Sequence, residues 1–384
     1  MKEWIEYKLS DIGEIVGGAT PSTKDESNYD GDIPWLTPKD LSTFSERYIE
    51  KGGRSITKKG FNSCSTKMLP ENSVLFSSRA PIGYVVIAAN EICTNQGFKS
   101  VIPNEKVYFL FLYYLLKYKK PDIEGMGSGT TFKEVSGNVM KNIVVRIPKD
   151  IKVQRRIAEI LDSIDSKIEN NNQINRNLSE QAMAIYKELI LNSSEKCSEG
   201  VLSDIANIIM GQSPKGDTYN ENGEGSVFYQ GRAEFGDRFP TRRLFTTAPK
   251  RMAKENSVLM SVRAPVGDVN VAYEACCIGR GLCSVASKDD HQSFVLYTMY
   301  SLKEQFDVYN GEGTVFGSIN KDSMNGMTIQ IPNKALMDKF EEIVSPMDAI
   351  IKANYEENCR LITMRDSLLP KLMSGELDVS ELDI

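Results

Sequence analysis

The chain has 384 residues and a net charge of −6, with 41% hydrophobic and 26% charged residues. This composition is typical of a soluble globular protein of two or three domains. The longest apolar run, residues 107–116, is too short to span a bilayer, so we expect no membrane partner. We see no signal peptide, and seven cysteines without a CxxC pair indicate reduced thiols. We therefore expect a cytoplasmic protein.

The first 150 residues carry mostly β-strand signals. Short apolar strands are predicted at 74–76 and 84–89, around an Arg-Ala-Pro-Ile-Gly turn. A further strand is predicted where Ile143, Val145 and Ile147 alternate with more polar neighbours. One helix is predicted over 107–118, closed by Lys119-Lys120-Pro121. These signals predict an α+β domain with a curved sheet.

A long amphipathic segment, residues 154–191, follows this region. Its apolar residues recur at alternating spacings of four and three, which is the pattern of a coiled-coil seam. The seam positions are Ile157, Leu161, Ile164, Ile168, Asn171, Asn175, Leu178, Ala182, Ile185 and Leu189. As one helix the segment would be about 57 Å long. Its two central asparagines are polar seam residues of the kind that fix register or partner choice at some cost in stability.

Residues 192–200 predict a linker, and beyond it the chain repeats itself. Residues 71–83 and 255–267 are identical at 10 of 13 positions. Further matches join Leu9–Ile12 to Leu202–Ile205, Gly18 and Pro21 to Gly211 and Pro214, residues 93–101 to 277–285, and residues 127–132 (GSGTTF) to 311–316 (GEGTVF). The repeat also predicts a helix over 291–306 and a strand around Ile329. Each half is therefore a globular region of about 150 residues followed by a long helix, a period far longer than that of a solenoid.

The second long helix carries the same seam 183 residues later. Its positions are Phe340, Val344, Met347, Ile351, Asn354, Asn358, Leu361, Arg365, Leu368 and Leu372. Two unrelated surface helices would not agree in phase at ten positions. We expect Pro346 and Pro370 to bend or interrupt this helix, because each removes a backbone donor.

The asparagine pairs bear on how the helices pack. An antiparallel pairing predicts Asn171 near Asn358 and Asn175 near Asn354. A parallel pairing would also align asparagine with asparagine, and the globular region between the helices is long enough to permit it. We favour the antiparallel arrangement because it sends the two globular regions to opposite ends.

Two stretches of this acidic chain are basic. Residues 46–67 contain six Lys or Arg against two Glu, and residues 229–254 contain seven against two acidic residues. Such patches suit a DNA-binding protein whose remaining surface meets something else, although two ordinary solvated loops would give the same count. Base contacts should come from positions where the halves differ. These candidates are Thr23, Lys24, Thr37 and Lys39 in the first half and Lys215, Tyr229, Gln230 and Arg232 in the second.

Further candidates for DNA contact lie in the basic stretches and the duplicated motifs. They are Lys58, Lys59, Arg79, Thr130, Thr131, Arg242, Arg243, Arg263 and Thr314. Arg79 and Arg263 precede Ala-Pro in both halves, and each could pair with a carboxylate and hold the turn or reach a phosphate or a guanine edge. Because two different half-sites would need different base contacts, we favour a structural or phosphate role for this shared pair.

No catalytic motif emerges. We find no phosphate-binding G-x-x-x-x-G-K-[ST] loop, no convincing nuclease carboxylates and no Asp/Asn-Pro-Pro-aromatic motif of adenine methyltransferases. The glycines of GSGTTF and GEGTVF favour a tight turn or close approach to a surface over a cofactor site. The one histidine, His291, disfavours histidine-based metal or triad chemistry. We therefore expect no catalytic residues, no cofactor and no metal in this chain.

Taken together, the motifs resemble those of the DNA-specificity (S) subunit of type I restriction–modification enzymes. The residues that carry the resemblance are the LSDI…G…P opening of each half, the ENSVL-x-S-x-RAP-x-G block, residues 95–98 (NQGF) and the tail Arg365–Gly375 (RDSLLPKLMSG). Together with the duplication they cover nearly the whole chain. One departure is that the second half has Gly279-Arg280-Gly281 where the first has Asn95-Gln96-Gly97.

The resemblance implies two tandem α/β target-recognition domains, joined by two long helices that form an antiparallel coiled coil. We expect recognition domains at 1–150 and 196–333 and helical spacers at 151–195 and 334–384. It further implies recognition of a split, asymmetric site in double-stranded DNA. The implied partners are two methyltransferase subunits, which carry S-adenosylmethionine and methylate adenine, and restriction subunits that use ATP and Mg²⁺.

Two other functions compete with a non-catalytic DNA-binding scaffold. One is a self-contained nuclease with cryptic catalytic residues, against which the absence of any motif counts. The other is a duplicated coiled-coil protein-interaction module, against which the basic patches count.

Overall fold

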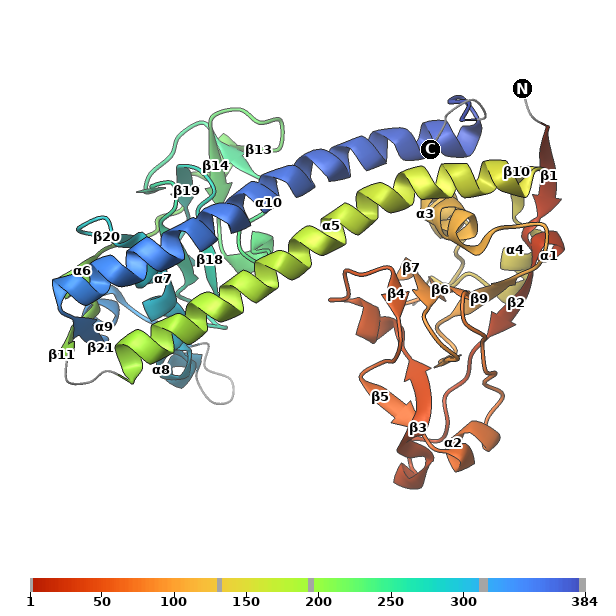
Figure 1. Cartoon of the computed structure of the whole chain (residues 1–384), viewed down its shortest axis with the longest axis horizontal. Coiled ribbons are helices and arrows are strands. Elements are labelled where there is room, and N and C mark those ends of the chain that lie inside the picture. Colours follow the sequence, from red (N-terminus) through yellow and green to blue (C-terminus); the bar gives the residue numbers. More distant parts are fainter. Residues whose placement is uncertain (1–2, 130–132, 193–196, 311–316, 380–384) are drawn as a thin grey trace. The chain divides into compact units, whose positions relative to one another are not determined.

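The computed structural model describes residues 3–129, 133–192, 197–310 and 317–379. The chain forms two compact units (Figure 1). Unit 1 comprises Met1–Asn171 with Glu356–Ile384, and unit 2 comprises Asn172–Tyr355. Each unit therefore holds one globular domain together with one part of each long helix.

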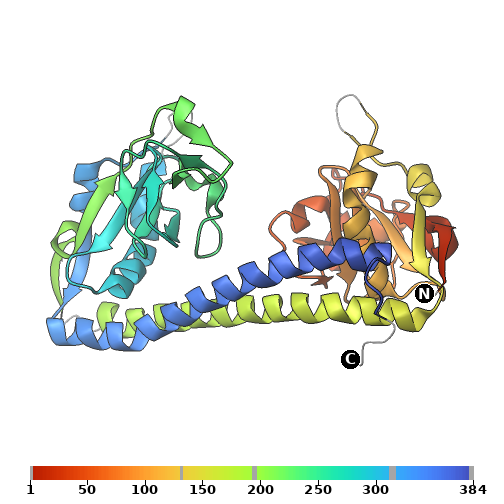
Figure 2. The same ribbon diagram turned by 90° about the horizontal axis from the view of Figure 1, so that it is seen from above.

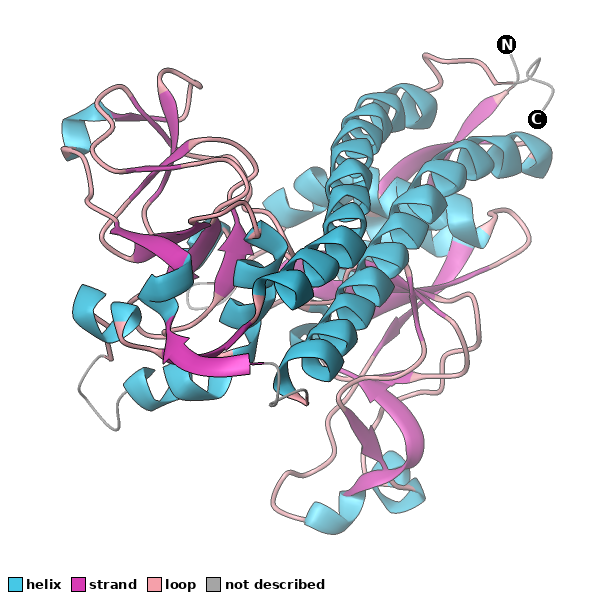
Figure 3. Cartoon of the chain, turned by 60° about the vertical axis from the view of Figure 1, so that its left-hand side comes forward, coloured by secondary structure: helices cyan, strands magenta, loops and turns pink. Residues whose placement is uncertain are grey.

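The domain of unit 1 contains three sheets. The strands, in their order within each sheet, are β1 (Trp4–Lys8) and β10 (Val144–Pro148); β2 (Gly13–Gly17), β9 (Lys99–Pro103), β6 (Val74–Ser78), β7 (Ile82–Ala88) and β4 (Tyr48–Ile49); and β5 (Arg54–Ile56), β3 (Tyr29–Leu36) and β8 (Cys93–Thr94). Strands β4 and β8 pair in parallel with their neighbours, and the remaining pairs are antiparallel. The three-stranded sheet lies at the end of the domain away from the long helices (Figure 3).

A central helix fills the space between the large sheet of unit 1 and α5. This helix, α3 (Phe109–Gly125), is buried at every position from Leu110 to Leu116. This first half of the helix is apolar all round because it packs against β6 and β7 on one side and against Ile157 and Leu161 of α5 on the other. The shorter helices of this unit are α1 (Leu9–Ile12), η1 (Glu26–Asn28), η2 (Pro38–Leu41), α2 (Lys58–Asn62) and α4 (Gly137–Asn142).

The domain of unit 2 follows the same plan with shorter strands. In their order within each sheet these are β11 (Cys197–Val201) and β21 (Thr328–Pro332); β12 (Ala206–Met210), β20 (Leu282–Ser287), β17 (Val258–Ser261) and β18 (Val269–Val271); and β13 (Tyr219–Asn220), β15 (Phe245–Thr246), β14 (Ser226–Tyr229), β19 (Cys276–Ile278) and β16 (Met252–Ala253). Its helices are α6 (Leu202–Ile205), η5 (Gly216–Thr218), η6 (Arg232–Glu234), α7 (Gln292–Ser301), α8 (Lys303–Asp307), η7 (Val308–Asn310) and α9 (Lys321–Asn325).

The long helices are α5 (Ile151–Tyr186), extended by a π-helical turn to Leu191, and α10 (Lys334–Ser374). Within each unit their segments run side by side (Figure 2). None of the twenty predicted seam positions is exposed. The predicted fold class is thus confirmed: α/β domains joined by two helices that form a coiled coil.

The direction of the coiled coil is fixed by contacts within each unit. In unit 1, Asp165 pairs with Arg365, and Asn171 Nδ2 donates to Asn358 Oδ1 over 2.9 Å. In unit 2, Asn354 Nδ2 donates to Asn175 Oδ1 over 2.8 Å. The numbers rise on one helix as they fall on the other, so the antiparallel pairing and both predicted asparagine contacts are confirmed.

Several predicted boundaries were wrong. Helix α3 continues through Pro121 to Gly125, and α10 runs unbroken through Pro346 and Pro370. All three prolines lie on exposed faces, so the buried face of each helix keeps its packing, which outweighs the lost backbone bonds. The predicted helix at 291–306 is divided at Leu302 into α7 and α8.

The predicted linker is shorter than residues 192–200. Cys197–Gly200 belong to β11, which pairs with β21 in antiparallel register. The segment is polar and gives no strand signal of its own. It forms a strand because it pairs with β21, which lies more than a hundred residues away in the sequence.

Candidate nucleic-acid interface

The duplicated Arg-Ala-Pro turn, residues 79–81 and 263–265, shares several backbone features in the two units, although Ala80 has a φ of +54° and Ala264 has no positive φ. Each turn holds a cis Ala-Pro bond and is followed by a glycine with positive φ, +96° in unit 1 and +89° in unit 2. In both, the serine two residues before the arginine donates its hydroxyl proton to the proline carbonyl, over 2.8 Å in unit 1 and 2.7 Å in unit 2. The sequence repeat therefore specifies a similar loop in both units.

Two further loops meet this turn in each unit. In unit 1, the Ser78 amide donates to Gly97 O over 2.7 Å and the Val135 amide donates to Ser78 O over 2.9 Å. In unit 2, the Val262 amide donates to Gly281 O over 2.9 Å. We call the three loops together the junction: residues 78–81, 95–97 and 133–135 in unit 1, and residues 262–265, 279–281 and 317–319 in unit 2.

The duplicated glycine of each opening motif is explained by its contact with the junction loop. A Cβ atom at Gly18 would lie 2.1 Å from Thr94 O, and one at Gly211 would lie 2.1 Å from Gly279 O. Neither distance is compatible with a side chain, so only glycine lets the segment after β2 or β12 approach. The segments that begin at these glycines carry the candidates Thr23, Lys24 and Lys215.

Arg79 is tied to a carboxylate at the junction of unit 1. Its Nη1 lies 3.2 Å from Glu134 Oε2, and Lys99 Nζ lies 3.2 Å from Glu134 Oε1. Of the two roles considered for Arg79, the structure shows the ion pair. The equivalent Arg263 is exposed and forms a backbone bridge with Ser318, and it makes no ion pair with another described residue. The two shared arginines thus have different surroundings.

The candidates of unit 1 fall into two groups. Lys58 and Lys59 lie on α2, which packs against η1 at the three-stranded sheet, and Thr23 and Lys24 lie just before η1. Lys59 Nζ lies 2.7 Å from Asp25 Oδ2. Hydrogen bonds from Lys59 and Ser27 lower the pKa of Asp25 to about 2. Lys24 and Lys58 are exposed and form no ion pair with another described residue.

The second group of unit 1 is Thr37 and Lys39 on η2. The amide and hydroxyl of Thr37 donate to Asp40 Oδ2 over 2.7 and 2.8 Å. Pro38 packs closely against Gly97 of the junction, since a Cβ there would lie 2.7 Å from Pro38 Cγ. Lys39 is exposed and forms no ion pair with another described residue, so η2 presents a cation beside the junction.

In unit 2, Gln230 and Arg232 lie at the junction. The Gly281 amide donates to Gln230 O over 3.3 Å, and Arg232 forms an ion pair with Asp268. Both side chains are exposed. Tyr229 was wrongly predicted as a base contact, because its side chain is only 1% exposed and belongs to the core with Ala253 and Ile278.

Arg242 and Arg243 are exposed but paired with carboxylates. Arg242 Nε lies 2.5 Å from Glu274 Oε1, and Arg243 Nη2 lies 2.5 Å from Glu234 Oε1. Lys215 is exposed, at the start of η5. The candidates Thr130, Thr131 and Thr314 lie outside the described residues.

Two arginines of the basic stretches point inward. The side chain of Arg47 is 7% exposed and contacts carboxylates of α5, and that of Arg238 is 10% exposed and contacts Asp348 of α10. The count of charges along the sequence included both as surface cations, which was wrong. Pairing with carboxylates elsewhere in the chain cannot be seen in a local charge count.

The described residues show no group of three His, Cys, Asp or Glu side chains arranged to hold a metal ion. In the part of the chain that the structure describes, no helix is both long and apolar enough to cross a membrane.

Comparison with known proteins identifies the family. The family model for the type I restriction modification DNA specificity domain matches residues 1–180 and again residues 195–360. The chain is 31% identical to the type I restriction enzyme MjaIX specificity subunit of Methanocaldococcus jannaschii, with 99% of this chain and 95% of that protein covered. It is 32% identical to the EcoR124I/EcoR124II specificity subunit of Escherichia coli, over 42% of this chain and 41% of that protein.

Among solved structures, the S subunit of a type I restriction–modification system from M. genitalium has the same fold. It superposes with a TM-score of 0.63 at 16% identity, covering 97% of this chain and 96% of that one.

Two tandem copies of the specificity domain, on a coiled-coil spacer, define a DNA-recognition subunit rather than an enzyme. The chain belongs to the family of type I restriction–modification DNA specificity subunits.

Proposed function

We propose that this chain recognises a bipartite, asymmetric DNA sequence, one part per domain, and holds methyltransferase and restriction subunits in one complex. Recognition is assigned to residues 1–150 and 196–333, and spacing to residues 151–195 and 334–384. The chain performs no chemistry of its own in this proposal.

The observation that carries the proposal is a shared junction with different exposed side chains around it. Both units build a similar turn from the same motif, yet unit 1 presents Lys39 where unit 2 presents Gln230 and Arg232. Similar scaffolds with different polar groups suit two different base sequences, since bases are distinguished by the donors and acceptors that meet their edges. Phosphate contacts, in contrast, only position the protein.

The residues proposed to contact DNA are all the sequence candidates except the buried Tyr229. In unit 1 these are Thr23, Lys24, Thr37, Lys39, Lys58, Lys59 and Arg79, with Thr130 and Thr131 of the glycine-rich loop. In unit 2 they are Lys215, Gln230, Arg232, Arg242, Arg243 and Arg263, with Thr314. Where a cation is already paired with a carboxylate, as in Arg79 and Arg243, binding of a phosphate would have to compete with that carboxylate.

The partners follow from the same proposal. The methyltransferase subunits would supply S-adenosylmethionine and methylate adenine in both half-sites, and the restriction subunits would supply ATP- and Mg²⁺-dependent activity. Such a complex acts on chromosomal DNA in the cytoplasm. All seven cysteines of this chain are free thiols, which suits that compartment.

Mobility-shift assays test the proposal directly. The purified chain, with and without its methyltransferase subunits, is mixed with a pool of random duplex DNA, and the bound fraction is sequenced. The proposal predicts two short conserved blocks separated by a gap of constant length. A single contiguous block, or cleavage by the chain alone, would favour a self-contained nuclease, and no enrichment would favour a protein-interaction module.

A further inference from the structure

Arg47 links the domain of unit 1 to its long helix through several directed contacts. It lies just before β4, and its Nε and Nη2 donate to the two carboxylate oxygens of Glu169, each over 2.8 Å. Nη2 also donates to Ser166 Oγ over 2.8 Å, and Nη1 pairs with Asp162. Burial alone would lower the pKa of Arg47, but the carboxylates outweigh it and raise that pKa, so the guanidinium stays charged.

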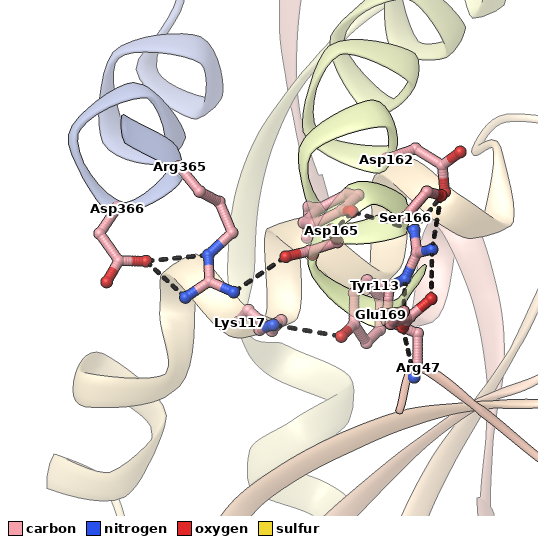
Figure 4. A network of polar contacts seen from close by, with 10 residues as sticks. Arg47, Tyr113, Lys117, Asp162, Asp165, Ser166, Glu169, Arg365 and Asp366 are labelled. Carbon is pink, nitrogen blue, oxygen red and sulfur yellow. Dashed lines mark hydrogen bonds and ion pairs between the residues drawn. The ribbon is translucent and has the colours of Figure 1, made fainter. Parts of the chain in front are cut away.

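Further side chains converge on the same face of α5 (Figure 4). Tyr114 of α3 donates its hydroxyl proton to Asp165 Oδ2 over 2.9 Å, and Arg365 Nη1 of α10 lies 2.9 Å from Asp165 Oδ1. Arg47 Nη1 also reaches the Tyr114 hydroxyl, at 3.5 Å. The segment before β4, helix α3 and helix α10 are therefore each bound to the same stretch of α5 by polar contacts.

Unit 2 contains a related arrangement, in which Arg238 meets one carboxylate of its long helix. Arg238 Nη2 pairs with Asp348 of α10, and the Tyr297 hydroxyl donates to Asp348 Oδ1 over 3.1 Å. Asp348 corresponds to Asp165 in the duplicated helices, and Asp165 binds Tyr114 and Arg365 rather than Arg47. The two arginines also occupy the same backbone position. The Ile87 amide donates to Arg47 O over 2.8 Å, and Val271, which corresponds to Ile87 in the repeat, donates to Arg238 O over 2.9 Å.

The sequence repeat does not align these arginines. Val271 follows Ile87 by 184 residues, whereas Arg238 follows Arg47 by 191 residues. The segment from each arginine to the repeat block differs between the units in length and sequence. Each segment nevertheless begins with an arginine that contacts the long helix of its own unit. Duplication of the whole unit, followed by divergence of the DNA-facing segments, would leave this common anchor.

In both units the arginine directly follows the segment that carries candidate base contacts. Helix η2 with Lys39 ends at Leu41, six residues before Arg47; the segment with Gln230 and Arg232 ends with η6 at Glu234, four residues before Arg238. Each anchor therefore fixes the end of a DNA-facing segment to the helix that spaces the two domains.

We infer that Arg47 and Arg238 are positioning residues that lock each recognition segment onto its helix and so fix the DNA gap between the half-sites. The inference rests on the proposed function. Both carboxylate oxygens of Glu169 hold Arg47 and so fix its orientation as well as its distance. Arg238 is held by Asp348 and by the hydroxyls of Tyr297 and Tyr300. When two binding modules are joined rigidly, their combined affinity is greatest at one separation and falls at others. If the connection between domain and helix is flexible, the combined affinity at the best separation falls, and a wider range of gap lengths is bound.

The test compares Arg47→Met with the wild-type chain, both in complex with the methyltransferase subunits. Lys149→Met is the matched control, because it removes one cation from unit 1 at an exposed ion pair with Glu3. Affinity is measured on duplexes with the selected half-sites at the native gap and at gaps one base pair shorter and longer. We expect Arg47→Met to reduce the preference for the native gap by about tenfold, with the half-site bases unchanged, and Lys149→Met to keep the wild-type preference.

The salt dependence of binding separates positioning from direct contact. Loss of a phosphate contact lowers the slope of log K against log salt by about one, so the positioning role predicts an unchanged slope for Arg47→Met. A reduced slope, a changed base preference, or wild-type gap preference in a folded variant would each overturn the inference. If Arg47→Met lowers the yield of folded complex, Arg47→Lys, which keeps the charge but loses the bidentate contact, and Arg238→Met in unit 2 serve the same test. Failure of the wild-type complex to bind any bipartite site would instead overturn the proposed function.

Discussion

At the residue scale, the asparagines show how a polar group specifies the helix pairing. Asn171 is fully buried, and its amide donates to Asn358 and to Glu357 Oε2, the latter over 2.7 Å. Asn175 and Asn354 form the same kind of pair but are half-buried. A buried amide without its partner costs free energy, so a shifted register would be penalised most strongly at Asn171.

We predict that Asn358→Leu lowers the free energy of unfolding by about 1–3 kcal/mol, because it leaves the Asn171 amide short of a buried partner. The double variant Asn171→Leu/Asn358→Leu should recover most of this loss, since two apolar residues pack well at a seam. Denaturant unfolding followed by circular dichroism measures both. Asn354→Leu, at the more exposed pair, is the control and should cost less. Equal losses for the single and the double variant would contradict a role for the pairing.

His291 predicts a pH dependence of stability for unit 2. Its Nε2 lies 2.7 Å from Asp338 Oδ1 and its Nδ1 lies 3.2 Å from Asp289 Oδ1. Burial alone would lower the pKa of His291, but the hydrogen bond with Asp338 and the negative charge of Asp289 outweigh it and raise that pKa. A raised pKa in the folded state adds stability that is complete below the unfolded pKa of about 6.5 and is lost as the pH rises through the folded value.

We therefore expect the stability of unit 2 to fall as the pH is raised from about 6 through the folded pKa of His291. His291→Asn should remove this part of the pH dependence, measured by denaturant unfolding at a series of pH values. The same slope in the variant and in the wild-type chain would assign the pH dependence to other groups.

Gln230 is the sharpest candidate for a base contact, because it is exposed at the junction of unit 2 and its side chain can bond adenine with two hydrogen bonds. We predict that Gln230→Ala weakens binding by about 1–3 kcal/mol and relaxes one base position. Selection from randomised duplexes measures the preference at every position. Relaxation in the half-site of unit 1 would contradict the assignment, and so would a uniform loss at all positions.

At the scale of the elements, the repeating patterns were predictable and the boundaries were not. Heptad spacing specified α5, α10 and their facing asparagines, because a coiled coil depends on local periodicity alone. The unbroken course of α10 through Pro346 and the strand at Cys197–Val201 depend on tertiary packing. Likewise, the burial of Arg47 and Arg238 could not be predicted, because their carboxylate partners lie more than a hundred residues away in the sequence. The candidate DNA-contact residues show the same difference. The repeated Arg-Ala-Pro turn was predictable from the sequence, but the sequence did not show which of its arginines forms an ion pair.

The coiled coil predicts how the gap in the DNA site depends on helix length. Three heptads inserted after Asn175 in α5, and three opposite them before Asn354 in α10, would lengthen the spacer by about 32 Å. This is close to one turn of DNA, about 34–36 Å, so both domains would again face the same side of the duplex. We expect unchanged half-sites and a gap longer by about nine base pairs, at about 3.4 Å per step.

The control for this prediction is the insertion into α5 alone, which leaves the seam unpaired and should abolish binding to the bipartite site. The gap is read from sequences selected by each complex. A native gap in the doubly extended chain would show that these helices do not set the spacing.

At the scale of the whole molecule, the duplication implies independent recognition by the two domains. Each unit has its own core, its own junction and its own arginine anchor. A chain of this design can change one half-site without disturbing the other, because the residues proposed to contact DNA and the residues of the cores are largely separate.

The central claim is that one domain recognises each half of a split site. The measurement that tests it most directly is the mapping of methylated adenines in genomes of cells that carry either the wild-type chain or a chimaera. In the chimaera, residues 1–150 come from another member of the family, and the methyltransferase subunits are the same. The account predicts a bipartite motif for both chains, in which one half-site changes and the other half-site and the gap stay the same. A contiguous motif, or a change in both halves, would contradict it.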